Sequence, residues 1–513
     1  MFVSGGKSDF AVKRYGKDWS DNVVKYNGRI VQFGFGAVGK SFYEKLSKEI
    51  RFNENKYYVI TGNPQEFDDF VSMGGIAPNF IVSEVTRDNF GTVFEPYLAE
   101  GDLLIDFADM VGTRDICEWC ALRNIMYINT GEADWPDHWY SIFNENDLKH
   151  ELRQKLAATP NVNQYPIVLH HGNNPGLVSH FVKAAIEYVA NTQFKKDKIL
   201  KSLIKDGKFN EAARYLGVRQ VHVNDVDLQE MKGDYRENLL YSTWCMESFW
   251  FEMLSEATIN IGTHEKIDYE EDCNYVKYDK GYLEFKRIAA DSRCATFYPN
   301  GKFEAYLVPH EETVSIAKNL EVKEGDQVVY RPTVLFLYQP CPFADRYFKE
   351  AKVNDYPNPD PSKPQDCEEG PEPYVIHGYV YPENFQVAYR EHIAEGTEYV
   401  GILLLGEKFD PVWVGNRIEP SFLYKNKKDA YWQTPTITPV SMSALAAVVW
   451  MLKNQNTGGI YFPDDIRDYN GIIKMAEKYI SKTIYKTFSK EEIARELGIR
   501  FEDLQVKDIF VKG

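Results

Sequence analysis

The sequence predicts an α/β protein: a Rossmann-type, doubly wound parallel sheet with an inserted α+β substrate domain. Strands alternate with helices over residues 29–131, an order that is typical of a parallel sheet. The glycine turn GFGAVG follows the apolar strand RIVQF and opens a helix. From about residue 219, strand-like segments follow one another over shorter connections, which indicates a second architecture.

The first predicted elements are the strand from residue 29, the glycine turn and the helix GKSFYEKL. KYYVITG, GDLLIDFAD and NIMYINTG read as further strands, and RDICEWCALRNI reads as an amphipathic helix between the last two. Cys117 and Cys120 have the spacing of a redox motif, but they fall inside that helix instead of before it. We interpret them as two half-buried helix cysteines.

Residues 165–188, YPIVLHHGNNPGLVSHFVKAAIEY, place polar side chains between an apolar strand and a helix. Asn174 is expected to cap that helix, with Pro175 as its first residue, because proline at that position gives up an N–H that has no partner. The turn would then lie at the carboxyl end of a strand, where ligands bind in open α/β sheets.

The predicted domains are an N-terminal extension (1–28), a dinucleotide-binding domain (29–175 and about 430–480), a substrate domain (176–429) and a C-terminal helical tail (481–513). The apolar helix in TPVSMSALAAVVWMLKNQNTGG has to be buried, and the first sheet is one surface that could cover it. Residues 354–374 read as a proline-rich acidic surface loop.

Composition narrows the class of protein. The 513 residues are 44% hydrophobic, and 59 Lys and Arg against 76 Asp and Glu give a net charge of −17. This balance argues against nucleic acid or an anionic membrane as a partner and is compatible with a cationic one. The first 27 residues lack the apolar core of a secretory signal, and no run is long enough to span a membrane. Seven cysteines without framework spacing fit a reducing compartment, so we expect a cytoplasmic protein.

The glycine turn is the motif with the clearest chemistry. Gly34 would make the tight turn, Gly36 would let the backbone approach a pyrophosphate, and Gly39 would allow close packing of helix on strand. With Ala37 and Val38 at the start of the helix, these residues form the predicted dinucleotide-binding segment. The alternative is a purely structural turn.

The second strand does not end on the acidic residue that usually holds a ribose hydroxyl. VITGNPQEF offers Thr61, Gly62 and Asn63 there, and Asp68 and Asp69 come later. This pattern therefore leaves the choice between NAD and NADP open.

Three further residues are candidates. Trp244 and Glu252 lie eight residues apart, so on a helix they would share one broad side, where a ring face and a carboxylate could hold an ammonium group. Spacing alone favours the alternative, an aromatic core helix with solvated acids. His310 fits either a proton shuttle or a strand-end histidine with a structural role.

Eight segments follow one another along the chain in a characteristic order. They are GFGAVGKS, HHGNNPGLVSHFVK, the Trp244 stretch, IGTHE, VPHEETVSIA, LYQPC, TEYVGILLLG and VSMSALAAVVWML. In that order the chain from about residue 29 to 480 resembles the bacterial-type homospermidine synthases, within the saccharopine dehydrogenase-like group. The resemblance implies a Rossmann domain completed by C-terminal chain, a tightly held NAD and a polyamine substrate. It also assigns site residues: Asn174, Trp244, Glu252, His310, Glu398 (where the family has aspartate), and either Glu132 or Asp134.

The implied activity is NAD-dependent condensation of two putrescines, or of spermidine with putrescine, to homospermidine, through an imine and the return of the hydride. His310 or a nearby carboxylate would be the base that deprotonates the reacting amine. Two alternatives stay open: a reductive-amination dehydrogenase of the carboxylated-polyamine or saccharopine type, and a non-catalytic polyamine-binding protein. We expect no metal and a homodimer.

Overall fold

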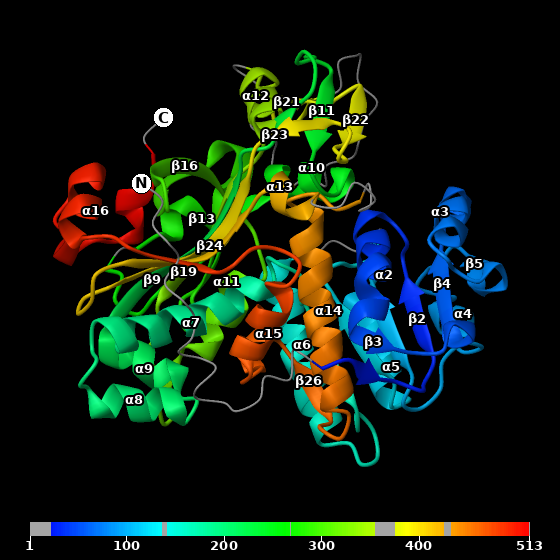
Figure 1. Ribbon diagram of the computed structural model, residues 1–513. Helices are drawn as coiled ribbons and strands as arrows, with labels where there is room; N and C mark the ends of the chain where they lie inside the picture. The colour runs from blue at the N-terminus through cyan, green and yellow to red at the C-terminus, as the bar shows by residue number, and fades with distance from the viewer. Residues whose placement is uncertain (1–21, 136–140, 267, 354–374, 425–431, 512–513) are drawn as a thin grey trace.

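The computed structural model describes residues 22–135, 141–266, 268–353, 375–424 and 432–511. The predicted acidic loop (354–374) and most of the N-terminal extension lie outside these ranges. Within them the chain forms two large sheets, and the blue and cyan elements of the first lie beside the green and yellow strands of the second, with the orange helix α14 between them (Figure 1). This arrangement confirms the predicted fold class.

The first sheet is parallel throughout the described chain, with strand order β26-β8-β7-β6-β2-β4-β5. From β5 to β8 this order is that of a doubly wound dinucleotide-binding sheet. β26 extends it with a strand from far along the chain. The strands are β2 (Ile30–Phe33), β4 (Tyr57–Thr61), β5 (Phe80–Val82), β6 (Leu103–Asp106), β7 (Met126–Asn129), β8 (Pro166–Val168) and β26 (Gly459–Tyr461).

Helices cover the first sheet. α14 contacts α2, β7 and β8, and all but its first-turn Val440 and its last residue Lys453 are buried, as its apolar sequence requires. Cys117 and Cys120 lie within α5, which confirms that they are helix cysteines, but both are fully buried and not half-buried as predicted. These helices are α2 (Ala37–Glu49), α5 (Thr113–Leu122), α6 (Ile142–Ala157) and α14 (Ile437–Lys453). Next to α14 lies α15 (Tyr469–Ala476), which in turn packs against α7 (Leu177–Thr192).

The second sheet is mixed, with the order β13-β14-β12-β19-β9-β24-β25-β27 and with β15 and β16 attached through β19. At its centre the long strand β9 pairs in parallel with β19 and antiparallel with β24. Its strands are β9 (Val218–Asp227), β12 (Glu256–Asn260), β13 (Cys273–Lys277), β14 (Tyr282–Ile288), β15 (Arg293–Tyr298), β16 (Gly301–Val308), β19 (Thr333–Gln339), β24 (Glu398–Gly406), β25 (Val412–Ile418) and β27 (Ile484–Thr487).

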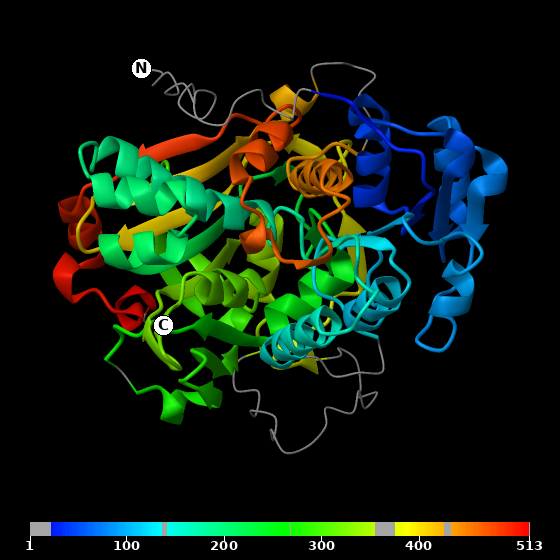
Figure 2. The same cartoon turned by 90° about the horizontal axis from the view of Figure 1, so that it is seen from below.

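Helix α7 connects the two sheets, because it follows β8 and packs against β24 and β25 (Figure 2). A smaller group of elements surrounds the aromatic segment that follows β11, as seen above the second sheet in Figure 1. These elements are β11 (Leu239–Ser242), α10 (Met246–Leu254), α12 (Pro342–Glu350) and β22 (Asn384–Val387). Outside this group, α8 (Lys198–Lys205) and α9 (Phe209–Leu216) lie beside α7, and α11 (Glu312–Asn319) packs against β19.

The helices in the described ranges were also compared with what a lipid bilayer requires. None of them has the combination of length and apolar character needed to cross one.

Candidate active site

The candidate site lies where the carboxyl ends of the first sheet's strands meet the second sheet. In parallel α/β sheets this edge is where ligands bind. From the end of each of three neighbouring strands, one contact crosses to the second sheet or to the segments that precede α10 and α11. They are Cys245 Sγ to Asp109 after β6 (3.5 Å), the Glu132 N–H after β7 to the Glu311 carboxylate, and Asn174 Nδ2 after β8 to Asp225 Oδ2 (2.8 Å).

The turn that carries Asn174 differs from the sequence prediction. Helix α7 begins at Leu177, and its N-cap is Gly176, with φ 130°, so Asn174 does not cap it and Pro175 is not its first residue. A Cβ at residue 176 would lie 2.1 Å from the Gly172 carbonyl oxygen, so the closed turn requires glycine there. The Asn174 amide is thereby free to donate to Asp225 in the second sheet.

The two histidines of this turn have different surroundings. His171 Nε2 lies 3.0 Å from His180 Nε2, and its Nδ1 lies 3.2 Å from the Ser443 hydroxyl. Burial lowers the pKa of both His171 and His180, so they are neutral members of the core. His170, in contrast, faces Glu132 across 3.0 Å at the carboxyl end of β7.

Three buried carboxyl groups gather on one face of β9 and β24. Glu398 pairs in register with Asp227, and Asp225 lies two residues before Asp227 on the same face. Burial raises the pKa of Asp225 to about 7 and that of Glu398 well above its ordinary value. Asp225 Oδ1 and Glu398 Oε2 accept no hydrogen bond from the residues that the structure describes. A cation between them would satisfy both oxygens.

Asp227 has a different role, because its oxygens are occupied. It accepts hydrogen bonds from the Gln229 backbone and side chain (2.9 and 3.0 Å) and from the Thr243 hydroxyl (2.8 Å). The last bond fixes the residue immediately before Trp244. Asp227 thus anchors the tryptophan segment beside the other two carboxyl groups.

Trp244 does not belong to a helix, so the predicted helical face shared with Glu252 is wrong. Helix α10 begins at Met246. The Ser242 hydroxyl accepts a hydrogen bond from the Trp244 N–H (3.2 Å) and donates one to the Cys245 carbonyl (3.1 Å), which forms a turn before the helix. The Trp244 ring is half-buried and contacts Phe249 edge to face at 6.1 Å. Thr243 and Asp227, and not helical periodicity, bring it to the site.

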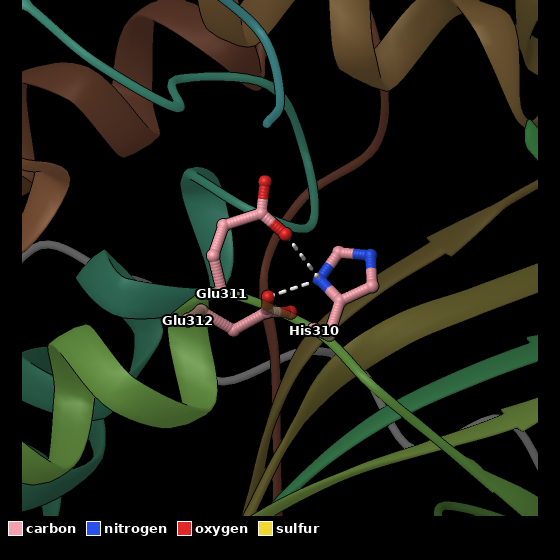
Figure 3. Close-up of side chains that lie close together, drawn as sticks. All are labelled: His310, Glu311 and Glu312. Atoms are coloured by element: carbon pink, nitrogen blue, oxygen red, sulfur yellow. Dashed lines mark hydrogen bonds and ion pairs between the residues drawn. The ribbon is translucent and has the colours of Figure 1, made fainter. Parts of the chain in front are cut away.

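His310 lies at the centre of an acidic group (Figure 3). Its Nδ1 contacts a Glu312 carboxylate oxygen and lies 3.6 Å from Glu311 Oε2. The ring stacks on Phe336, with 4.2 Å between centroids. Burial alone would lower the pKa of His310, but the surrounding carboxylates, first that of Glu312, raise it to about 10. His310 is therefore an imidazolium at neutral pH.

Glu252, on α10, approaches the other side of the same ring, with 3.9 Å between its Oε1 and His310 Nε2. Burial raises the pKa of Glu252 to about 8, although the His310 charge opposes the shift. A carboxyl group with such a pKa exchanges a proton near physiological pH, as a general acid or base has to do.

The structure places the carboxylates of Glu132 and Asp134 in different surroundings. The Glu132 carboxylate contacts Lys149 and His170, and its N–H donates to Glu311, so it adjoins the His310 group. Asp134 accepts the N–H of Trp135 at 2.7 Å and lies 3.9 Å from Arg87. Of the two carboxylates, that of Glu132 is therefore the one beside His310, and its role in the reaction stays a prediction.

The ligand atoms of His310, Glu311 and Glu312 all lie within 4.8 Å of one another, a spacing that a metal ion can bridge. In the structure, however, the imidazole and the carboxylates are partners of each other. The prediction that the site works without a metal stays a prediction.

The glycine turn fits a dinucleotide. Gly34 has φ 84°, and a Cβ there would lie 2.8 Å from the backbone of Phe107, whereas one on Gly39 would lie 2.6 Å from the Gly34 carbonyl. Both positions therefore require glycine for packing. A Cβ on Gly36 would meet no atom within 4 Å, so the space in front of it is open. α2 has no side-chain cap and no acid in its first turn, which leaves the N–H groups of Ala37 and Val38 available to a phosphate.

The end of β4 carries an acidic residue that the sequence reading passed over. Glu66 is buried, and its carboxylate accepts a hydrogen bond from the Thr61 hydroxyl at 2.8 Å. Asp69, which the sequence offered, is instead paired with Lys40 at 2.5 Å. Glu66 follows the strand by five residues, so it stood outside the position where a ribose-binding acid is usually sought.

Sequence reasoning also missed Asp225, Asp227, Glu312 and Lys149. A signal existed for the first two, because the strand VHVNDVDL places both acids on the face that begins with Val221 and Val223, since alternate residues share a face. Glu312 and Lys149 had no comparable signal, since acids and lysines on helices are ordinarily solvated.

The fold and the glycine turn define a dinucleotide-binding protein, and comparison with known proteins agrees. The family described as saccharopine dehydrogenase NADP binding domain matches residues 30–165. Over the whole chain the similarity is to homospermidine synthases. Those of Mesorhizobium japonicum and Blastochloris viridis are each 25% identical, over 94% of this chain and 94% and 96% of their own lengths. The resemblance predicted from the motifs is confirmed.

Solved structures show the same fold. The homospermidine synthase of Legionella pneumophila, solved in complex with NAD, has a TM-score of 0.74 at 23% identity and covers 91% of this chain and 93% of its own. The apo saccharopine dehydrogenase (L-Glu forming) of Saccharomyces cerevisiae has a TM-score of 0.50 at 12% identity, with 90% and 100% covered. The two-sheet architecture is thus shared with both kinds of enzyme.

Proposed function

We propose that the protein is an NAD-dependent homospermidine synthase, which condenses two putrescines, or spermidine with putrescine, and releases ammonia. The observation that carries the proposal is the buried pair Asp225 and Glu398, with two carboxylate oxygens lacking partners among the described residues, beside Trp244 at the cofactor edge of the first sheet. A dicationic diamine matches these carboxyl groups in charge once they are ionised. Similarity to homospermidine synthases over nearly the whole chain supports the same substrate class.

The residues that would hold NAD are Gly34, Gly36, Ala37, Val38 and Gly39, with the pyrophosphate at the start of α2. Bound there, NAD supplies the chemistry that accepts a hydride from the carbon next to the amine and gives it back. The buried Glu66 carboxylate at the end of β4 supports NAD over NADP, because it would repel a phosphate on the ribose.

The substrate amine has to be deprotonated before its carbon can lose a hydride, because an ammonium has no lone pair. His310 carries its own proton at neutral pH, so it is assigned as a proton donor rather than as the base. Glu252 is the base. An incoming ammonium favours its ionised form, and the carboxylate can then take up the proton of the reacting amine.

The remaining groups bind and orient the substrate. The Asp225 and Glu398 carboxyl groups hold a distal ammonium, and the Asn174 amide keeps Asp225 in place from the first sheet. The Trp244 ring face stabilises the cation that develops when the amine becomes an iminium. In the exchange step, the second diamine's nitrogen forms a bond to the imine carbon, the original nitrogen receives a proton, and its bond to carbon breaks to release ammonia.

The alternative dehydrogenase would bind a carboxylated substrate and would need a free cation facing it. The carboxyl groups of Asp225, Glu252 and Glu398 do not provide that. A purely binding protein would leave the substrate unchanged. Incubation of the diamines (putrescine, or spermidine plus putrescine) with NAD, and of an amino acid plus an aldehyde with NADH or NADPH, distinguishes these alternatives by mass spectrometry. Homospermidine and ammonia in equal amounts support the synthase. Product formed only from the carboxylated substrates would contradict the synthase and support the dehydrogenase.

We further propose a cytoplasmic location. The six cysteines within the described ranges are free thiols, a state that a reducing compartment maintains. A homodimer stays a prediction, which light scattering on the purified protein would test.

A further inference from the structure

A buried lysine with no role in the reaction proposed above lies next to the site. Lys149, on α6, is 1% exposed, and its Nζ is paired with the Glu132 carboxylate. His170 completes the group, with its Nε2 3.2 Å from Lys149 Nζ and 3.0 Å from Glu132 Oε2. Three polar side chains from three separate segments thus meet at the carboxyl end of β7.

Burying this group is unfavourable unless its members stay paired. Burial lowers the pKa of Lys149, and the Glu311 carboxylate opposes the shift. The pKa of His170 lies well below its ordinary value, because of burial and then the Lys149 charge, so this imidazole is neutral. Burial brings the pKa of Lys149 to about 7, so the positive charge that this group carries near neutral pH is that of Lys149 and not of His170.

Glu132 connects this group to the reacting end of the site. Its backbone N–H donates to the Glu311 Oε1, and the other oxygen of Glu311 lies 3.6 Å from His310 Nδ1. A displacement of Glu132 would therefore move a hydrogen bond that orients Glu311. His170 is held from the same side, because its N–H donates to the Asn129 side chain at 2.8 Å.

We propose that Lys149 is a positioning residue for the reaction assigned above. It keeps Glu132 ionised and fixed, and through the Glu132 N–H it keeps the Glu311 carboxylate turned toward His310. The inference rests on the proposed function for its kinetic consequences, but the pairing itself is measurable in the folded protein without turnover.

The test compares Lys149→Met, Glu132→Gln and the double variant. In Lys149→Met the buried Glu132 carboxylate loses its cation and takes up a proton. Turnover with putrescine should fall on the order of tenfold to a hundredfold at pH 7, the effect of displacing a reacting group slightly. The loss should shrink as the pH rises and Glu132 ionises again, which a merely structural defect would not produce.

The double variant carries the decisive comparison. If Lys149 acts through Glu132, Lys149→Met should cause no further loss of turnover in the Glu132→Gln background, and the double variant should melt at a higher temperature than Lys149→Met alone. The matched control is Lys155→Met on the same helix, which removes an exposed pair with Glu118 (2.6 Å) and should change neither quantity.

Wild-type turnover and pH dependence in folded Lys149→Met would overturn the inference, as would an equal loss of turnover in both backgrounds. If Lys149→Met does not fold, the double variant is compared with Glu132→Gln alone, and a further loss of turnover overturns the inference. Failure of the wild type to form homospermidine would count against the proposed function, whereas additive changes in melting temperature would count against the pairing of Lys149 with Glu132.

Discussion

Asp225 on β9 and Glu398 on β24 present buried carboxyl groups on one face of neighbouring antiparallel strands, and each keeps one oxygen unbonded by the described residues. The pKa of Asp225 is raised to about 7, and that of Glu398 lies well above its ordinary range, in both cases first because of burial. In the free protein these two carboxyl groups therefore carry protons, partly or wholly, at neutral pH, and a bound cation can replace those protons. The first prediction depends on this exchange.

Binding of putrescine at pH 7 should release protons to the solvent. A bound dication favours the ionised forms of Asp225, Glu398 and Glu252, which the free protein holds partly or wholly protonated. Titration calorimetry with the NADH-loaded protein, which cannot oxidise the diamine, in buffers of different ionisation enthalpy measures the number released. Glu398→Gln should lower that number. A binding heat that is independent of the buffer would mean that these carboxyl groups do not hold the diamine.

Glu252 should determine the low-pH limb of activity. Its pKa is raised to about 8, so kcat/KM should rise as the pH increases through that value and the base becomes ionised. It should fall again near pH 10, where His310 loses its proton. Glu252→Gln should reduce turnover by about a hundredfold to ten-thousandfold and remove the lower limb.

The amines of putrescine titrate in the same way for both proteins, so the difference between the two pH profiles reports Glu252 itself. An unchanged lower limb in the glutamine variant would assign that limb, and the base, to another group.

Trp244 should contribute through its ring face. Trp244→Phe should keep much of the activity, because phenylalanine retains a weaker π-face, whereas Trp244→Ala should lose on the order of thirtyfold or more, the value of a desolvated cation–π contact. Part of the loss should appear in kcat, since the iminium forms only along the reaction path. Turnover is measured per folded molecule below the melting temperature.

The control for this measurement is Trp250→Phe on α10. Trp250 is buried and stacks on Phe348 at 5.7 Å, so its substitution should lower stability and leave turnover per folded molecule unchanged. Equal turnover of wild type and Trp244→Ala would remove Trp244 from the site.

Gly36→Val should abolish NAD binding without unfolding the protein. A Cβ at this position meets no atom within 4 Å, so the added side chain would enter only the space assigned to the pyrophosphate. Gly36→Ala should have a smaller effect on the dissociation constant. Fluorescence titration measures binding, and melting without NAD reports folding. Unchanged affinity in a folded Gly36→Val would make the turn purely structural.

The parts of the fold that could be predicted are those encoded locally. A buried strand, a glycine turn and a helix follow one another within about twenty residues, and this order defined the first sheet. The pairing of β9 with β24 joins segments far apart in the chain, and periodicity contains no signal for such a partner. Asp225 could therefore be recognised only as an acid within a predicted strand. That Glu398 lies next to it could not be predicted.

Two local predictions were wrong because a side chain had another partner. Asn174 has the properties of a helix cap, but its amide is bonded to Asp225, and Gly176 takes the cap position. Trp244 has helical spacing to Glu252, but the Ser242 hydroxyl closes a turn before the helix begins. The contact of Asn174 with the second sheet outweighed its preference for a helix cap. The hydrogen bonds of the Ser242 hydroxyl outweighed the helical spacing of Trp244.

The most direct test of the whole account is the balance of cofactor and product. With putrescine in excess and a small amount of NAD, homospermidine should accumulate to many times the amount of NAD, with one ammonia per homospermidine and no steady rise of NADH absorbance. This is expected because the hydride taken from the first diamine returns within the same turnover. Product limited to the amount of NAD, with NADH accumulating in step, would contradict the account and indicate a dehydrogenase.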